Sequence, residues 1–163
     1  MENKTGLDIR LSQMSEYLAL VKEILSKKFN KIPLAMVVTY GCQQNVSDSE
    51  HFKGMLSEMG FAFTEDANEA DFMLFNTCAV REHAEDRVFG NIGALKHYKR
   101  RKPELIIGIC GCMVQQDAVA ERFKKSYPYV DLLFGTHVKH RLPEFLYRLL
   151  TGKGRVFEIA DTD

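Results

Sequence analysis

Three of the four cysteines in this chain stand directly after an apolar run. Cys42 follows "LAMVVTYG", Cys78 follows "DFMLFNT" and Cys112 follows "ELIIGICG". Short apolar runs of this kind are typical of strands that are buried on both faces of a sheet. Three thiols at equivalent points of the chain can share one site if their strands are neighbours.

The chemistry of such a site follows from the ligand type. Thiolates are soft ligands that favour zinc, copper(I) or an iron–sulfur cluster. A structural zinc site usually has close C-x-x-C pairs and four protein ligands, whereas these cysteines lie 36 and 34 residues apart. Three cysteines suit a 4Fe–4S cluster whose fourth iron is not held by a protein cysteine. That iron can take an exogenous ligand, which points to chemistry more than to electron storage.

The alternative for every cysteine is a place in the core. Free cysteine is among the most buried residue types and packs as a small hydrophobe. Gly41 and Gly111 directly precede two of the three cysteines, and this repeated arrangement favours a shared site for Cys42, Cys78 and Cys112. For Cys110 we favour the core.

The elements that must position the cysteines alternate regularly. The apolar patterns predict strands at 34–39, 61–64, 71–76, 104–109, 130–135 and 155–160, and helices at 45–60, 81–101, 117–127 and 138–150. In the first of these helices, Ser47 and Glu50 have the spacing of a capping box. This order predicts an α/β three-layer sandwich, Rossmann-like or flavodoxin-like, with a mainly parallel sheet of about five to six strands. Because parallel strands end at one edge, the three cysteines should converge there.

The N-terminus follows a different pattern. Residues 1–16 are polar, and we expect them to be loosely ordered. Residues 16–29 place apolar side chains at helical spacing, which predicts an amphipathic helix. We therefore divide the chain into an N-terminal helical extension, 1–33, and a domain, 34–163. The final "ADTD" looks like a linker or a cut.

Composition sets the remaining limits. The chain has 163 residues, 45% of them hydrophobic, with 22 basic and 22 acidic residues. This fits one domain and argues neither for nor against nucleic acid as a partner. No apolar stretch approaches the roughly 20 residues of a membrane span, and the N-terminus lacks the order of a secretory signal. We expect a cytoplasmic protein without a membrane partner, in which cysteines serve as thiols or metal ligands.

Three segments carry a resemblance to a known family. These are "TYGCQQNVSDSE", "ADFMLFNTCAVREHAEDRVFGNIG" and "GICGCMVQQ". Together they resemble the N-terminal domain (UPF0004 type) of the radical-SAM methylthiotransferases, and the similarity runs from about Leu34 to the C-terminus. Within that group, "GCQQN" is most similar to the tRNA enzymes that make 2-methylthio-isopentenyladenosine beside the anticodon. It departs from them at Gln44, where methionine is usual.

The resemblance implies a function. Cys42, Cys78 and Cys112 would ligate an auxiliary 4Fe–4S cluster that helps to build or deliver the methylthio group to tRNA. In the family a second 4Fe–4S cluster, held by a C-x-x-x-C-x-x-C motif in a following barrel domain, cleaves S-adenosylmethionine. That motif does not occur in these 163 residues, so we expect this chain to be inactive without its own radical-SAM domain. Two rivals are a methylthiotransferase acting on a ribosomal-protein aspartate and a zinc or redox-thiol module for protein interaction.

Polar residues near the cysteines have a structural and a functional interpretation. Asparagine satisfies backbone groups in turns and caps helices, but it can also donate toward a cluster or substrate. Glutamines at 43, 44, 115 and 116 either line the mouth of the site or face solvent. The basic run "KHYKRRK" (96–102) complements a helix dipole or contacts tRNA phosphates. Our candidate cofactor-binding residues are Asn45, Asn76, Thr77, Gln43 and Arg81.

Overall fold

The computed structural model describes residues 6–78, 82–152 and 154–159, and in this part of the chain six strands form one sheet. All neighbouring strands are parallel, in the order β2-β1-β3-β4-β5-β6. Their bounds are β1 (Leu34–Thr39), β2 (Ala62–Phe63), β3 (Phe72–Thr77), β4 (Ile106–Gly111), β5 (Leu132–Phe134) and β6 (Val156–Glu158). The predicted α/β class and its parallel sheet are confirmed.

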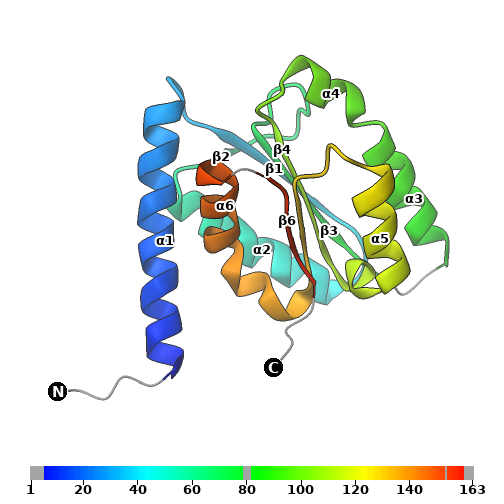
Figure 1. Cartoon of the computed structure of the whole chain (residues 1–163), viewed down its shortest axis with the longest axis horizontal. Coiled ribbons are helices and arrows are strands. Elements are labelled where there is room, and N and C mark those ends of the chain that lie inside the picture. Colours follow the sequence, from blue (N-terminus) through cyan, green and yellow to red (C-terminus); the bar gives the residue numbers. More distant parts are fainter. Residues whose placement is uncertain (1–5, 79–81, 153, 160–163) are drawn as a thin grey trace.

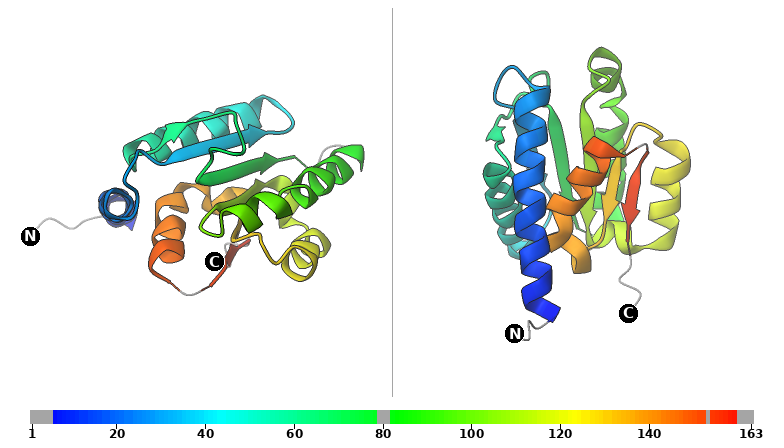
Figure 2. Two further views of the ribbon diagram at one scale, coloured as in Figure 1. Left: turned by 90° about the horizontal axis from the view of Figure 1, so that it is seen from above. Right: turned by 60° about the vertical axis from the view of Figure 1, so that its left-hand side comes forward.

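Helices cover both faces of the sheet, which makes three layers (Figure 1). One face carries α1 (Gly6–Lys28), α2 (Gln43–Glu58) and α6 (Leu142–Thr151). The other carries α3 (Glu82–Gly93), α4 (Lys96–Arg101) and α5 (Asp117–Ser126). Two short 3₁₀ segments, η1 (Cys112–Gln115) and η2 (Thr136–Arg141), follow β4 and β5. The views in Figure 2 show the sheet between the two helical layers.

Strand β3 shows why both faces are covered. Every residue of β3 is buried, and successive side chains in a strand point to opposite faces. Phe72 and Leu74 pack with α1, α2 and α6, whereas Met73 and Phe75 pack with α3 and α5. A central strand with apolar side chains on both faces therefore needs a helical layer on each side.

Helix α1 begins at Gly6, about ten residues before the predicted start. The expectation that residues up to 16 are loosely ordered was therefore wrong for the part of them that the structure describes. The C-terminal half of α1 packs on the domain, with Val21 and Leu25 buried in the core and Tyr17 against the ring of Tyr147. Once packing holds one half of a helix, each further turn adds hydrogen bonds without a new nucleation cost.

Three other boundaries differ from the prediction. Helix α2 begins at Gln43, so Ser47 and Glu50 lie inside it and form no capping box. The single helix expected at 81–101 is two helices, because the chain turns at Ala94–Leu95, where the Leu95 side chain is buried. The last predicted helix begins as η2 and becomes α-helical at Leu142. No helix in the described residues is both long and apolar enough to span a membrane.

Candidate metal centre

The three predicted ligands follow three adjacent strands. Strands β1, β3 and β4 are neighbours in the sheet. Cys42 is the N-cap of α2 just after β1, Cys78 follows the last residue of β3, and Cys112 opens η1 after β4. Strand order reverses between β1 and β3, and this switch point is where parallel α/β sheets bind ligands beyond the carboxyl ends of their strands.

Gly41 brings the turn after β1 directly against Cys78. Its φ is +100°, a conformation that L side chains rarely adopt. A Cβ atom at Gly41 would lie 2.4 Å from Cys78 Cβ and 2.9 Å from Cys78 Sγ. The absent side chain therefore allows Cys42, the next residue, to stand beside Cys78.

Gly111 makes the equivalent approach from β4. Its φ is +107°, and a Cβ there would lie 2.1 Å from the carbonyl oxygen of Thr77. The turn after β4 is thus pressed onto the end of β3, one residue before Cys78. Residues two apart in a strand share a face, but the turn at Gly111 gives its two neighbours different surroundings. Cys110 is buried in the core beneath α2 and α6, as expected, whereas Cys112 is exposed.

The thiols also influence one another electrostatically. Hydrogen bonds from the backbone N–H groups of Asn45 and Gln44 lower the pKa of Cys42, and a weaker contribution comes from the side chain of Cys78. Burial raises the pKa of Cys112, and the charges of Cys78 and Cys42 raise it further. Each of these thiols therefore lies within electrostatic range of the others. A helix N-terminus that favours a thiolate at Cys42 is a typical setting for a metal-binding or reactive cysteine.

Two asparagines hold the turns around the cysteines together. Asn45 Oδ1 accepts a hydrogen bond from Cys42 Sγ at 3.2 Å, and Asn45 Nδ2 donates to Asn76 Oδ1 at 3.2 Å and to Thr77 O at 2.9 Å. Asn76 Nδ2 donates back to Asn45 O at 2.9 Å. The Thr77 hydroxyl donates to Cys110 O at 2.6 Å. Among the described residues, these contacts show the structural role that we weighed for Asn45, Asn76 and Thr77.

Residues outside the set of predicted site residues extend this network. Asn76 Nδ2 also donates to Ser49 Oγ at 3.1 Å, and Ser49 Oγ lies 2.6 Å from Thr39 Oγ1. Asp48 accepts hydrogen bonds from Gln44 and from Lys139 of η2. Asn45, Asp48 and Ser49 are spaced three and four residues apart, so they share one face of α2. That spacing of polar residues was the available signal.

The predicted glutamines divide into two groups. Gln43, Gln44 and Gln116 are exposed, and Gln115 is half-buried. Gln44 Nε2 donates to Asp48 at 3.0 Å, and Gln115 Oε1 accepts from Thr136 Oγ1 at 3.1 Å. Two of the four thus tie the rim of the site together. Arg81 lies outside the described residues.

A single metal ion and an iron–sulfur cluster require different arrangements of ligands. Among residues 6–78, 82–152 and 154–159, no three His, Cys, Asp or Glu side chains meet closely enough to hold one metal ion. An iron–sulfur cluster makes a different demand, because each cysteine binds its own iron. Three thiols beyond the ends of three neighbouring strands, with no side chain at Gly41 to separate Cys42 from Cys78, are compatible with that demand.

The basic run at 96–102 has a partly structural role. Lys99 Nζ lies 2.7 Å from Asp131 Oδ2, and Lys102 Nζ lies 3.2 Å from Asp71 Oδ1. These two pairs attach α4 and the residue that follows it to the segments just before β3 and β5. Lys96, Arg100 and Arg101 are exposed. Because the cysteines lie at the opposite edge of the sheet, this run is no part of the candidate site.

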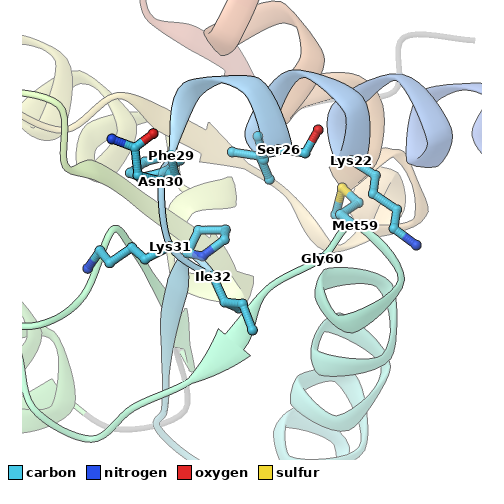
Figure 3. Close-up of a pocket in the computed structure, with 10 residues that line it drawn as sticks. Lys22, Ser26, Phe29, Asn30, Lys31, Ile32, Met59 and Gly60 are labelled. Atoms are coloured by element: carbon cyan, nitrogen blue, oxygen red, sulfur yellow. The ribbon is translucent and has the colours of Figure 1, made fainter.

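A hollow of about 390 Å³ also lies away from the cysteines. It is formed where the end of α1 and the segment before β1 meet the end of α2 (Figure 3). Its lining includes Lys22 and Ser26 of α1, and Ile32, whose side chain is 66% exposed. The lining residues that lie just before β1 and β2 place the hollow at the edge where these strands begin. This is the edge opposite the candidate metal centre.

The fold and the site define a class: an α/β domain with cysteines just after three neighbouring strands of a parallel sheet, around its switch point. The chain belongs to a family described as the uncharacterized protein family UPF0004, whose model matches residues 35–135. The matched segment contains all four cysteines and ends directly after β5.

Three curated relatives share the name tRNA-2-methylthio-N(6)-dimethylallyladenosine synthase. The protein from Caldicellulosiruptor saccharolyticus is 45% identical over all of this chain and 35% of its own length. That from Halalkalibacterium halodurans is 52% identical over 76% of this chain and 23% of its own length. That from Acetivibrio thermocellus is 43% identical over 94% and 32%. The chain thus spans about a third or less of these relatives, which are tRNA methylthiotransferases.

Proposed function

We propose that this chain is the iron–sulfur domain of a tRNA methylthiotransferase that adds a methylthio group to isopentenyladenosine next to the anticodon. Cys42, Cys78 and Cys112 would each hold one iron of a 4Fe–4S cluster, and the fourth iron would carry no protein ligand. When bound, such a cluster supplies a coordination position for a sulfur-containing ligand. The full protein would act in the cytoplasm, with S-adenosylmethionine and a second cluster in its radical-SAM domain.

One observation carries the proposal: the three cysteines come just after three adjacent parallel strands, at the same edge of the sheet. Packing three thiolates together is unfavourable, because like charges repel one another. A cationic metal group between them reverses this effect, because metal binding favours the deprotonated ligands.

The protein's own residues would prepare the site before any cofactor binds. Asn45 and Asn76 lock the turn after β1 to the end of β3. The N-terminus of α2 directs backbone N–H groups toward Cys42 and favours its thiolate. A site held in its final geometry binds its cofactor without a further loss of conformational freedom.

A zinc or redox-thiol module is supported less well. Zinc needs its ligands around a single ion, and the described residues offer no group of three that meets this condition. The substrate assignment rests on the names of the relatives, all of which are tRNA enzymes. Those names favour tRNA over a ribosomal-protein aspartate.

Anaerobic reconstitution with iron and sulfide tests the cluster. The unaltered chain should take up about four irons and develop broad visible absorption. Cys42→Ala, Cys78→Ala and Cys112→Ala should each lose a stable cluster. Cys110→Ala is the matched control, because Cys110 is buried in the core, and it should keep the cluster. A normal cluster after loss of any of the three thiols would contradict the ligand assignment.

A further inference from the structure

The segment after β5 forms an additional wall of the site, although it carries no cysteine. In η2, Lys139 Nζ lies 2.8 Å from Asp48 Oδ1 of α2, and Thr136 donates to Gln115 of η1 at 3.1 Å. One contact reaches the helix that Cys42 caps, and the other reaches the turn that Cys112 opens. The segment therefore connects the elements of two candidate ligands.

Asp48 is the charged group at the centre of this wall. Its side chain is 11% exposed, and it lies with Lys139 around a small hollow that Asn76, Cys110 and Gly111 also line. Gln44 Nε2 contacts the same carboxylate oxygen as Lys139. The shared hollow places the carboxylate close to Gly111, the residue directly before Cys112.

This arrangement poses an electrostatic problem for the proposed function. Three thiolates bring negative charge to a sheet edge that already holds a nearly buried carboxylate. An uncompensated charge at Asp48 would oppose thiolate formation and would also oppose the addition of an electron to a cluster there. A cation in direct contact with Asp48 reduces this repulsion.

We propose that Lys139 is a positioning residue of the cysteine site, which neutralises Asp48 and so allows an anionic iron–sulfur group to be held and reduced beside it. The inference rests on the proposed function and adds a residue to it. Lys139 acts on the thiols through the charge of Asp48 and not by direct contact. Its effect is electrostatic, so it depends on the charge of the side chain and on the presence of the carboxylate.

The test compares the midpoint potential of the reconstituted cluster in four variants. Lys139→Met should shift the potential to more negative values and speed cluster loss to a chelator several-fold, because Asp48 is left uncompensated. Lys139→Arg keeps the charge and should restore both values. Asp48→Asn should shift the potential in the opposite direction. The double variant Lys139→Met with Asp48→Asn should return close to the unaltered chain.

The matched control is the pair of Lys99 and Asp131, which has a similar contact distance and lies at the opposite edge of the sheet. Lys99→Met should lower thermal stability and leave the potential unchanged. If Lys139→Met binds a full cluster at an unchanged potential, or if Lys139→Arg behaves as Lys139→Met does, the inference is overturned. An unaltered chain that takes up no iron would overturn the proposed function, and the inference with it.

Discussion

At the scale of single residues, the glycines before Cys42 and Cys112 allow the turns after β1 and β4 to pack against the end of β3. Both have positive φ, and both pack against the end of β3. The close approach of Gly41 to Cys78 and of Gly111 to Thr77 leaves no room for a side chain. Each glycine is thus required twice, once for the turn and once for contact with the neighbouring strand.

Gly41→Ala should therefore damage the site. The added methyl group collides with Cys78, and the positive φ becomes strained, so we expect a loss of about 1–3 kcal/mol in the free energy of unfolding. Urea denaturation followed by circular dichroism measures this loss. Iron uptake should fall as well, because relief of the collision moves Cys42 away from Cys78.

Gly54→Ala provides the control within the same region. Gly54 lies inside α2, where an added Cβ meets no atom within 4 Å. Alanine is the better helix former, so this variant should gain about 0.5–1 kcal/mol and keep its iron uptake. If the two variants had equal stability, Gly41 would not be the constraint that we describe.

Some residues of the candidate site could be predicted from the sequence, and others could not. The cysteines could be selected because each repeats one local pattern, an apolar run that ends on a thiol. The pairing of Asp48 with Lys139 could not be selected, since the two residues lie 91 positions apart in the chain. Their pairing depends on the packing of η2 against α2, and no local pattern encodes that contact.

At the scale of elements, Arg155 attaches the last strand to the end of α5. Its guanidinium donates to four backbone oxygens, those of Phe123, Lys124, Tyr127 and Val130. Carbonyl groups in the last turn of a helix have no partner within the helix. A planar, charged group with five N–H donors can satisfy several of them at once.

Arg155→Ala should lower the free energy of unfolding by about 1–3 kcal/mol, since four hydrogen bonds to a charged group are lost. The oxygens of Phe123 and Tyr127 each keep one backbone partner, from the N–H groups of Tyr127 and Val130. Arg155→Lys should recover only part of this, because an ammonium group cannot reach all four oxygens. Thermal unfolding measures both values.

The comparison for Arg155 is Arg100→Ala, at an exposed position on α4. Its effect should stay within about 0.5 kcal/mol, as expected for a surface substitution. Equal losses in Arg155→Ala and Arg100→Ala would show that Arg155 has no special role in holding β6 to α5.

Element types were more predictable than element ends. All six strands were placed within about two residues, because apolar runs bounded by turn residues leave little choice. The prediction of a single helix at 81–101 was wrong. The apolar pattern in the sequence continues across Ala94–Leu95, whereas the structure has two helices there. Only the packing of Leu95 into the core beneath α3 and α5 decides that the chain turns there.

At the scale of the whole molecule, the chain spans about a third or less of the length of the curated relatives it matches. Its core is shared between two helical layers that enclose one sheet (Figures 1 and 2). The candidate site is at the edge formed by the carboxyl ends of the strands. The proposed reaction needs S-adenosylmethionine chemistry, for which the chain has no C-x-x-x-C-x-x-C motif.

The reconstituted chain should therefore show no methylthiolation by itself. The assay supplies tRNA that bears isopentenyladenosine, S-adenosylmethionine and a reductant, and detects modified nucleosides by mass spectrometry. A full-length relative is the positive control. Detectable 2-methylthio product from this chain alone would sink the view that it is one part of a larger transferase.

The sequence by itself determined the class of the fold, the strands and the three candidate thiols, because hydrophobic periodicity and residue type are local properties. Only the tertiary structure decided that β1, β3 and β4 are neighbours, that Gly41 and Gly111 close on the end of β3, and that Lys139 meets Asp48. These facts depend on strand order and on contacts between distant segments. They are selected by the packing of the whole core, to which each residue contributes only a part.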